Sequence, residues 1–383
     1  MNYTKITPLL AYLSLLIILL CSCKSVQYVE VATLSLANPH ATLRTKLLYQ
    51  KIKALSQQGI LIGHQDATAY GINWKASKKF PYKSDIKDVT GKYPAVHGWD
   101  VGRIELGKAA NLDRVSFDLM RKQILKTYKK GGISTLSWHV NNPASGGDSW
   151  DTIPAVSTIL RGGINRNKYE AWVKKLGEFI KSLKTGNGEL IPIVFRPYHE
   201  MNGSWFWWGA QHCSVEEYKA LFRDLVWLLG QNGVHNILYA YSPNTLHKDE
   251  EYGLYYPGDA YVDILGIDIY NHSGDGVYTE KLKNDIAVMR EFSRTRNKPY
   301  ALTETGNMKP DHLKWWTEIL YPGIKDSGIA WVLFWRNAKK SHYFAPYPSE
   351  PSSEDFKIMS LKKDILFLKE IRRYKFKEAK YPK

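Results

Sequence analysis

The sequence predicts an α/β protein built on a single (β/α)8 TIM barrel. Eight short apolar runs alternate with amphipathic stretches whose lengths suit the crossover helices of a parallel barrel. Polar and aromatic residues follow these runs, and functional side chains of such barrels sit at the carboxyl ends of the strands. The 383 residues leave room for insertions. No glycine-rich phosphate loop follows any run, which argues against a dinucleotide-binding fold.

The individual elements are predicted from apolar periodicity along the chain. Strands are expected at 60–64, 94–100, 133–139, 190–195, 236–241, 262–270, 299–304 and 330–335. Helices are expected at 42–55, 117–129, 169–183, 215–229, 279–295 and 313–320. Trp315 and Trp316 lie on the last helix, where we expect them in the outer core because barrel helices cover the outside of the sheet.

The segment 191–209 carries the strongest signal for function. It begins as a buried strand and then places Glu200 before four aromatic residues, at 205–208. A carboxylate at the end of a buried strand is costly unless it is paired or used. We interpret it as an acid at the floor of a cleft with aromatic walls, which suits the C–H face of a sugar ring. In the alternative interpretation, Glu200 only pairs with Arg196 and the tryptophans fill a core.

A second glutamate, Glu304, ends the predicted seventh strand and would face Glu200 across the mouth of a closed barrel. Glycosidic cleavage requires two such carboxyl groups: one donates a proton to the leaving oxygen, and the other attacks or activates water. Burial and a neighbouring negative charge can keep one of them protonated near neutral pH. Tyr270 is placed to hydrogen-bond the attacking carboxylate, and Arg196 to balance its charge. No second histidine follows His199 at helical spacing, so neither a metal nor a cofactor is expected.

Two motifs resemble glycoside hydrolase family 26, which consists mostly of β-mannanases on retaining (β/α)8 barrels. They are Arg196-Pro197-Tyr198-His199-Glu200-Met201-Asn202-Gly203-Ser204-Trp205-Phe206-Trp207-Trp208-Gly209 and Leu302-Thr303-Glu304-Thr305-Gly306. The resemblance extends from Gly63-His64-Gln65 to Phe334-Trp335-Arg336-Asn337. The pair His199-Glu200 is specific, because most related barrels carry asparagine before the acid.

This resemblance implies a role for each matching residue. Glu200 would be the acid/base, and Glu304 the nucleophile of a double displacement that retains configuration. His199 would contact the sugar near the nucleophile, Tyr270 would orient Glu304, and Trp205 would support the sugar next to the scissile bond. The other expected substrate-binding residues are His139, Trp150, Arg196, Asp268, Trp335 and Arg336, with Asp66, Asp100 and Arg103 as further candidates.

The substrate implied by the resemblance is β-1,4-mannan, galactomannan or glucomannan. The protein itself is expected to be a monomer. Manno-oligosaccharides such as mannobiose are the expected products, with Trp335 and Arg336 as a clamp for the second sugar. The nearest alternative is the same fold acting on xylan or mixed-linkage β-glucan. A non-catalytic glycan-binding lipoprotein is disfavoured, because such a barrel would not need both glutamates together with His199 and Tyr270.

The chain opens with a predicted signal peptide at residues 1–22. Lys5 precedes an almost wholly apolar run at 9–20, which is too short for a permanent membrane-spanning helix. The sequence Leu20-Cys21-Ser22-Cys23 resembles the lipobox of bacterial lipoproteins, so Cys23 is expected to carry lipid. Residues 23–39 would form a linker and 40–383 the catalytic domain. We expect an exported protein of a Gram-negative bacterium, periplasmic or membrane-anchored; the alternative is ordinary secretion with cleavage nearby.

Composition limits the other partners. The formal charge is +16, with basic residues scattered over surface-like segments such as 121–130 and the tail 372–377. Nucleic-acid binding would require basic side chains gathered around the aromatic groove, but acidic side chains are found there instead. No nucleic-acid partner is therefore expected. Attraction to an anionic polysaccharide or membrane surface stays open. With two of the three cysteines in the leader, Cys213 is expected to be a lone buried thiol.

Overall fold

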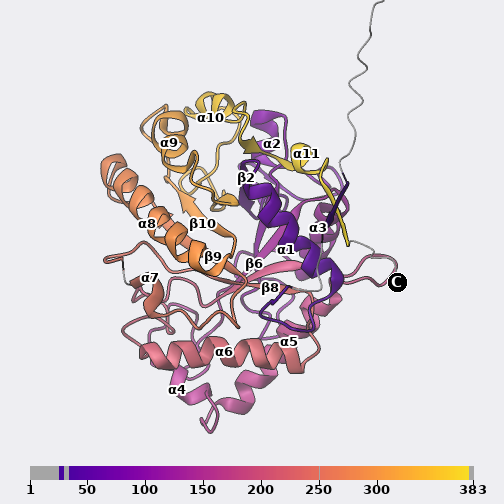
Figure 1. The fold of residues 1–383 in the computed structure, drawn as a ribbon, viewed down its shortest axis with the longest axis vertical. Helices are drawn as coiled ribbons and strands as arrows, with labels where there is room; N and C mark the ends of the chain where they lie inside the picture. Colours follow the sequence, from indigo (N-terminus) through magenta and orange to yellow (C-terminus); the bar gives the residue numbers. More distant parts are fainter. Residues whose placement is uncertain (1–25, 30–33, 250, 379–383) are drawn as a thin grey trace, which may run out of the picture.

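The computed structural model describes residues 26–29, 34–249 and 251–378, which contain a closed parallel barrel (Figure 1). Each barrel strand pairs in parallel with the next, and the last pairs back onto the first. The predicted (β/α)8 barrel is therefore confirmed. In chain order the barrel strands are β2 (Ile60–Gln65), β5 (Val96–Asp100), β6 (Ile133–Trp138), β7 (Ile193–Pro197), β8 (Ile237–Tyr241), β9 (Ile264–Tyr270), β10 (Tyr300–Gly306) and β11 (Trp331–Phe334).

Helices surround this barrel and bury one apolar stripe each against it. In α6, for example, the buried residues recur at helical spacing, and Ser214 and Glu217 close a capping box at its start. The predicted helix at 313–320 is instead a π-helix, η1 (Trp315–Leu320), followed by a short α-helix; Trp315 and Trp316 are buried, as expected. The helices are α1 (Leu43–Ser56), α2 (Asp85–Thr90), α3 (Phe117–Lys129), α4 (Val156–Ile159), α5 (Arg166–Ser182), α6 (Val215–Gln231), α7 (Glu251–Leu254), α8 (Asp275–Arg296), α9 (Tyr321–Ile324), α10 (Ser353–Met359) and α11 (Leu368–Ile371).

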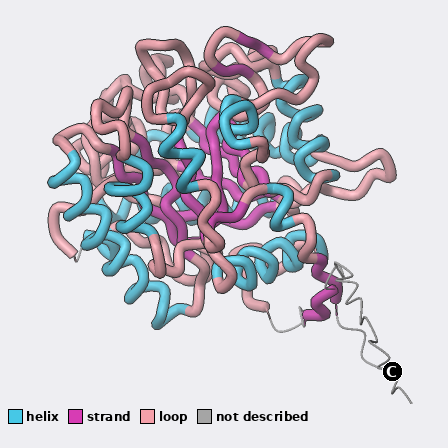
Figure 2. Tube along the Cα trace, turned by 90° about the horizontal axis from the view of Figure 1, so that it is seen from above, coloured by secondary structure: helices cyan, strands magenta, loops and turns pink. Residues whose placement is uncertain are grey.

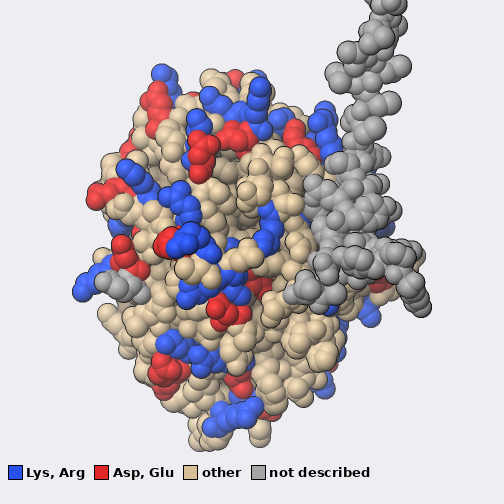
Figure 3. Space-filling view, in the orientation of Figure 1, with Lys and Arg blue, Asp and Glu red and all other residues tan. Residues whose placement is uncertain are grey.

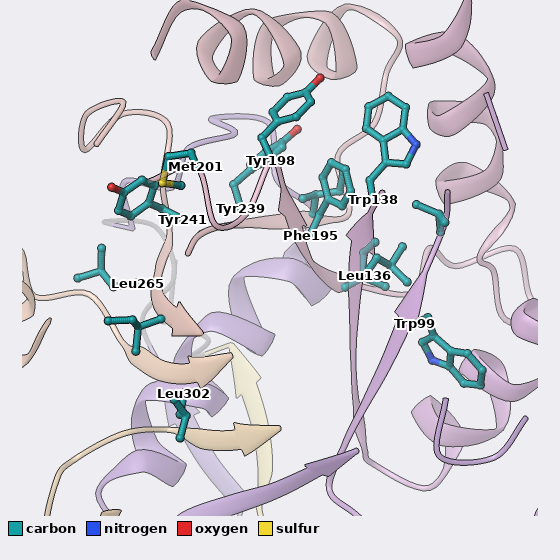
Figure 4. Close-up of a cluster of buried hydrophobic side chains, with 14 of the residues drawn as sticks. Trp99, Leu136, Trp138, Phe195, Tyr198, Met201, Tyr239, Tyr241, Leu265 and Leu302 are labelled. Carbon is teal, nitrogen blue, oxygen red and sulfur yellow. The ribbon is translucent and has the colours of Figure 1, made fainter. Parts of the chain in front are cut away.

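Alternate strand residues enter two separate cores. Phe195 and Tyr239 point outward and join the large aromatic cluster between sheet and helices, which Figure 4 shows with Trp138 and Tyr198. Val194, next to Phe195, joins the smaller cluster that fills the barrel interior. This alternation follows from the period of two along a strand. It also directs Arg196, two residues after Val194, toward the barrel axis.

Helix α1 lies across the end of the barrel where the strands begin. Its Lys51 Nζ donates to the Gly131 carbonyl (2.7 Å), before β6, and the Thr42 amide at its cap donates to the His235 carbonyl (2.9 Å), before β8. Leu48, Ile52 and other α1 residues complete the interior core. Figure 1 looks onto this end of the barrel, with α1 in front. The sequence predicts this helix, but not that it closes the barrel.

The predicted linker contains ordered structure. Strand β1 (Val26–Val29) pairs in parallel with β13 (Lys375–Glu378), with Val26 opposite Lys375. Farther along, Ala37 is buried, and its amide donates to Asp263 Oδ1 (2.8 Å). The packed domain therefore begins before residue 40. Figure 2 shows the β1–β13 pair at the end of the molecule opposite the long loops.

Smaller strands complete the description. Strand β12 (Ile365–Leu366) pairs in parallel with the first two residues of β2, and β3 (Tyr70–Gly71) with β4 (Trp74–Lys75) forms a hairpin after β2. Within the described ranges, no helix is both long and apolar enough to cross a membrane. The predicted signal peptide and the lipid-bearing Cys23 lie outside the described residues.

Candidate active site

The carboxyl ends of the strands surround a pocket of about 590 Å³. Glu200, just after β7, and Glu304, in β10, approach from opposite walls. One oxygen of each, together with an oxygen of Asp268, lies within 4.8 Å of the others. The residues lining the pocket are His139, Trp150, His199, Glu200, Trp205, Phe206, Asn244, Thr245, His247, Tyr270, His272, Ser273, Lys281, Glu304, Trp335, His342 and Phe344.

The backbone at Glu200 takes a conformation that side chains rarely adopt. Tyr198 (φ +47°) and Glu200 (φ +56°) both occupy the left-handed region, which costs about 1–2 kcal/mol per residue. Side chains from elsewhere hold this turn: Tyr218 Oη donates to the Tyr198 carbonyl (3.0 Å) and Trp208 Nε1 to the His199 carbonyl (2.8 Å). The Glu200 amide donates to the Ser242 carbonyl of the neighbouring loop (2.8 Å). The strained turn is thus clamped on three consecutive residues.

Glu200 sits in an environment that favours its protonated form. The side chain is nearly buried, and it accepts hydrogen bonds from Trp205 Nε1 (2.8 Å) and Asn244 Nδ2 (2.9 Å). Burial first, and then the charge of Glu304, raise the pKa of Glu200 to about 7, although those two donors and Arg196 act in the opposite direction. A carboxyl group with such a pKa can both give and take a proton near neutral pH.

Glu304 has the opposite surroundings, which stabilise its negative charge. It accepts hydrogen bonds from Tyr270 Oη (2.7 Å) and from the Arg196 guanidinium, and His199 Nε2 lies 4.0 Å away. Burial, Arg196 and His139 hold the pKa of His199 well below its usual value, so this histidine is neutral. A fixed carboxylate beside a neutral, polar side chain is suited to nucleophilic attack.

Asp268 lies beneath the floor of the pocket, fully buried, where it holds Arg196. Its Oδ2 accepts from Arg196 Nη1 (2.7 Å), and its Oδ1 accepts from Thr303 Oγ1 (2.7 Å). Arg196 therefore bridges Asp268 and Glu304. Glu200, Asp268 and Glu304 form the carboxylate cluster that could hold a metal ion among the described residues. The guanidinium already supplies the positive charge that this cluster needs, and a metal would have to displace it.

Exposed indoles form the walls around the two acids. Trp150 is 47% exposed and stacks on His139, with ring centroids 5.2 Å apart and planes at 17°. His139 is fixed from behind by a hydrogen bond between Nδ1 and Asp100 Oδ2 (2.7 Å). Burial lowers the pKa of His139, but the charge and hydrogen bond of Asp100 outweigh it and raise that pKa above its usual value. Trp205, 38% exposed, forms another part of the wall.

The expected aromatic walls are only partly formed by residues 205–208. Trp207 and Trp208 are fully buried, and their Nε1 atoms donate to the carbonyls of Val140 (3.0 Å) and His199 (2.8 Å). They support the wall from within the outer core. Phe206 lines the pocket, although it is almost buried, because it stacks on Trp208 at 4.4 Å between centroids.

Three expected substrate-binding residues do not line the pocket. Arg196 and Asp268 lie under its floor, as described above. The guanidinium of Arg336 turns away from the two glutamates to Asp113 Oδ1 (3.0 Å) and the Tyr70 hydroxyl (3.5 Å). The further candidates Asp66, Asp100 and Arg103 are also absent from the lining.

Comparisons with known proteins agree with this geometry. Residues 37–318 match the family described as Glycosyl hydrolase family 26. The chain belongs to this family. The resemblance seen in its motifs and the prediction of a glycosidase are thereby confirmed.

Individual relatives show how far the similarity extends. A mannan endo-1,4-β-mannosidase of Bifidobacterium adolescentis is 36% identical over 285 residues, which are 72% of this chain but only 28% of that longer protein. A mannan endo-1,4-β-mannosidase of Bacillus subtilis is 30% identical, over 76% of this chain and 79% of its own. The solved structure of a family 26 β-mannanase from Bacteroides ovatus is 44% identical, with a TM-score of 0.83 over 86% of this chain and 97% of its own.

Sequence reasoning missed several residues of this family 26 pocket. Asn244, which binds Glu200, follows β8 and is therefore marked by its place at a strand end. Phe344 and His342 come from a long loop after β11, where no periodic pattern points to the site. His272 stacks on Tyr270 with planes at 14°, a contact that depends on the loop after β9.

Proposed function

We propose that the protein hydrolyses β-1,4-mannosidic bonds in mannans with retention of configuration. The observation that carries this proposal is the pair Glu200 and Glu304, two carboxyl groups of contrasting environment within one aromatic-walled pocket. The relatives of this chain, mannan endo-1,4-β-mannosidases and a family 26 β-mannanase, support the choice of substrate.

In the first step Glu304 attacks the anomeric carbon while Glu200 gives its proton to the leaving glycosidic oxygen. Arg196 and Tyr270 orient the attacking carboxylate through their hydrogen bonds. The sugar becomes covalently attached to Glu304, and the remainder of the chain leaves as a free alcohol. Trp205, whose Nε1 binds Glu200, is placed to support the sugar on the leaving side.

In the second step the deprotonated Glu200 takes a proton from water, and the resulting hydroxide attacks the same anomeric carbon. The bond to Glu304 breaks, and the carboxylate returns to Tyr270 and Arg196. Retention is supported by the closeness of the two acids. Retaining enzymes hold their carboxyl groups about 5–5.5 Å apart, whereas inverting enzymes leave about 6.5–9.5 Å for a water. One oxygen of Glu200 lies within 4.8 Å of one oxygen of Glu304, which is closer to the retaining range than to the inverting one.

A substrate panel tests this assignment. The protein should release reducing sugar from mannan, galactomannan or glucomannan, and the new anomeric centre should appear first in the β-configuration by proton NMR. The Glu304→Ala variant should not hydrolyse mannan but should still be retarded by mannan in an affinity gel. Glu216 is an exposed glutamate on α6, and the Glu216→Ala variant should behave as wild type. Hydrolysis by Glu304→Ala, or an initial α-product, would reject the proposal.

Mannobiose is the proposed main product. Trp335 and His139 lie together at one end of the cleft, with ring centroids 6.2 Å apart, and could hold a second sugar. Chromatography of the products from mannohexaose would test this. A related activity on β-glucan is a second candidate, because one relative, 27% identical over 40% of this chain, is an Endoglucanase H. Faster release of reducing sugar from glucan or xylan than from mannan would favour this second candidate.

We also propose that the protein is exported and anchored through Cys23 and that it acts as a monomer. The apolar run at 9–20 and the sequence Leu20-Cys21-Ser22-Cys23 support this location. Cells fed labelled palmitate should incorporate the label into the wild-type chain and not into Cys23→Ser. Label in both proteins, or in neither, would contradict the anchor. Light scattering of the purified protein would test the oligomeric state.

A further inference from the structure

The end of the barrel opposite the active site carries a concentration of basic side chains. Helix α1, which covers this end, contains Arg44, Lys46, Lys51 and Lys53 and no acidic residue. The mouth, by contrast, is built around carboxylates such as Glu200. The fold therefore gathers basic residues that look scattered along the sequence onto one face. Figure 3 shows this face, with blue basic side chains spread across it and red acidic side chains interspersed among them.

One hollow on this face is lined mainly by basic side chains, of which Lys92 is paired with Glu370 (3.5 Å). It has a volume of about 160 Å³ and lies between the loops that enter β5 and β6 and helix α11. Lys369 and Arg372 are exposed and form no hydrogen bond or ion pair with another described side chain, and Lys130 is exposed with its ammonium over Tyr82 (5.4 Å). The lining residues are Gly91, Lys92, Tyr93, Lys130, Leu368, Lys369 and Arg372.

Strand β1, which follows Cys23 in the sequence, pairs with the segment that comes just after Arg372 of this hollow. Val26 pairs with Lys375, which is only three residues after Arg372. Cys23 precedes Val26 by three residues, so a fully extended chain places it roughly 10 Å or less from Val26. This distance is comparable with the Debye length of about 8 Å at physiological ionic strength. Because Arg372 is three residues from the partner of Val26, a bilayer attached at Cys23 would lie at the same end of the molecule as Arg372 and its neighbours.

We propose that this basic face docks on an anionic phospholipid membrane, with a phosphodiester headgroup in the hollow formed by Lys130, Lys369 and Arg372. Docking turns the barrel so that the mouth of the active site, at the far end, opens away from the bilayer toward soluble glycan. The direction of attachment rests on the lipid anchor proposed for Cys23, but the affinity of the face for anionic lipid does not.

Vesicle binding by the Cys23→Ser chain, which cannot be acylated, tests the face alone. Protein is sedimented with vesicles of phosphatidylcholine or of phosphatidylcholine containing 30% phosphatidylglycerol. We expect binding to the anionic vesicles to exceed binding to the neutral ones and to fall as salt rises. Each basic residue near an anionic surface strengthens binding about fivefold. The additional change Lys130→Glu/Lys369→Glu/Arg372→Glu removes three cations and adds three carboxylates, so it should weaken binding by at least about 100-fold.

A matched control separates the face from net charge. Lys122→Glu/Lys174→Glu/Lys283→Glu reverses three exposed cations on the flanking helices α3, α5 and α8 and should leave vesicle binding within about twofold of its parent. Equal losses in both triple variants, or no loss in either, would overturn the proposal. So would tighter binding to a DNA duplex than to the anionic vesicles.

Hydrolysis of soluble mannan serves as the folding control, because Lys130, Lys369 and Arg372 are remote from the pocket. Both triple variants should hydrolyse it at the wild-type rate. If no variant cleaves any glycan but the vesicle results hold, the proposed activity fails and the docking face stands. If palmitate labelling fails while the vesicle results hold, only the direction of attachment is lost.

Discussion

Two residues of the same type acquire different chemistry from their neighbours. Glu200 is surrounded by neutral donors, whereas Glu304 accepts a hydrogen bond from a guanidinium. Burial and the Glu304 charge therefore raise the pKa of Glu200 to about 7. Because the first step needs Glu200 protonated, activity should fall as the pH rises through this value. The pH profile of kcat/KM should thus have a descending basic limb near pH 7.

The hydrogen bond from Asn244 offers a way to move that limb. Asn244 Nδ2 donates to Glu200 Oε1 (2.9 Å) and so stabilises the charged form. In Asn244→Ala this stabilisation is lost, and the pKa of Glu200 should rise further. The basic limb of kcat/KM should then move to higher pH, whatever the loss in rate. A limb that moves to lower pH, or does not move, would contradict this role.

Arg196 is expected to matter for stability as well as for catalysis. In Arg196→Met, Asp268 and Glu304 are left buried without their cation, which costs about 3–5 kcal/mol for a broken buried pair. Urea unfolding should show this loss. Arg196→Met/Asp268→Asn removes one of the two unpaired charges and should recover part of the stability but none of the activity. If the single variant is as stable as wild type, the bridge is not structural.

That Glu200 and Glu304 meet in one pocket could be predicted from the sequence, but the support beneath them could not. Glu200 and Glu304 each follow an apolar run, and strand ends meet at the mouth of a barrel. Asp268 also ends such a run, yet it lies under the floor. The pairing of β9 with β10 shifts register between Leu302 and Glu304, which brings Glu304 opposite Asp268. Such a bulge leaves no signal in the pattern of apolar residues.

At the scale of elements, the turn after β7 is held in place by α6. Tyr198 and Glu200 are in the left-handed region, and Tyr218 on α6 donates to the carbonyl of Tyr198. A turn that costs free energy persists only where its surroundings fix it. Helix α6 thus positions the acid as well as covering the barrel.

The hydroxyl of Tyr218 is therefore a positioning group for Glu200. Tyr218→Phe keeps the ring and loses one buried hydrogen bond, which should cost about 1 kcal/mol of stability. Because the turn can then relax, kcat should fall by about tenfold with little change in KM. Tyr255→Phe is the matched control, since Tyr255 packs edge-on against Tyr218 with ring centroids 5.7 Å apart and its hydroxyl forms no hydrogen bond with a described residue. Equal kcat values for the two variants would remove this role from Tyr218.

The elements themselves were largely predictable, because apolar runs of strand length and amphipathic runs of helix length alternate along the chain. The functions of some elements were not. Helix α1 is only weakly amphipathic, and it closes the barrel through contacts with distant loops such as the one at Gly131. Strands β1 and β13 pair across nearly the whole sequence, so neither has a local signal that identifies its partner.

At the scale of the whole molecule, the barrel places basic side chains at one end and carboxylates at the other. It also buries titratable groups, and burial shifts the pKa values of histidine and aspartate in opposite directions. His97 on β5 is fully buried, and burial lowers its pKa to about 4, although its hydrogen bond to the Pro94 carbonyl acts in the opposite direction. Asp263, also buried, has its pKa raised to about 6. Between about pH 4 and 6 the two therefore bias stability with opposite signs: the histidine favours higher pH, and the carboxyl group favours lower pH.

His97→Gln isolates the histidine contribution. The unfolded chain takes up a proton at His97 below about pH 6.5, while the folded chain does not do so until about pH 4. The free energy of unfolding should therefore lose roughly 3 kcal/mol through this group as the pH falls across that window. Glutamine can keep a donor near the Pro94 carbonyl but does not titrate. Urea unfolding at pH 7.5, 6.0, 5.0 and 4.5 should show a stability curve for His97→Gln that is less steep than that of wild type by up to about 1.4 kcal/mol per pH unit. Parallel curves would show that His97 is protonated equally in the folded and unfolded states.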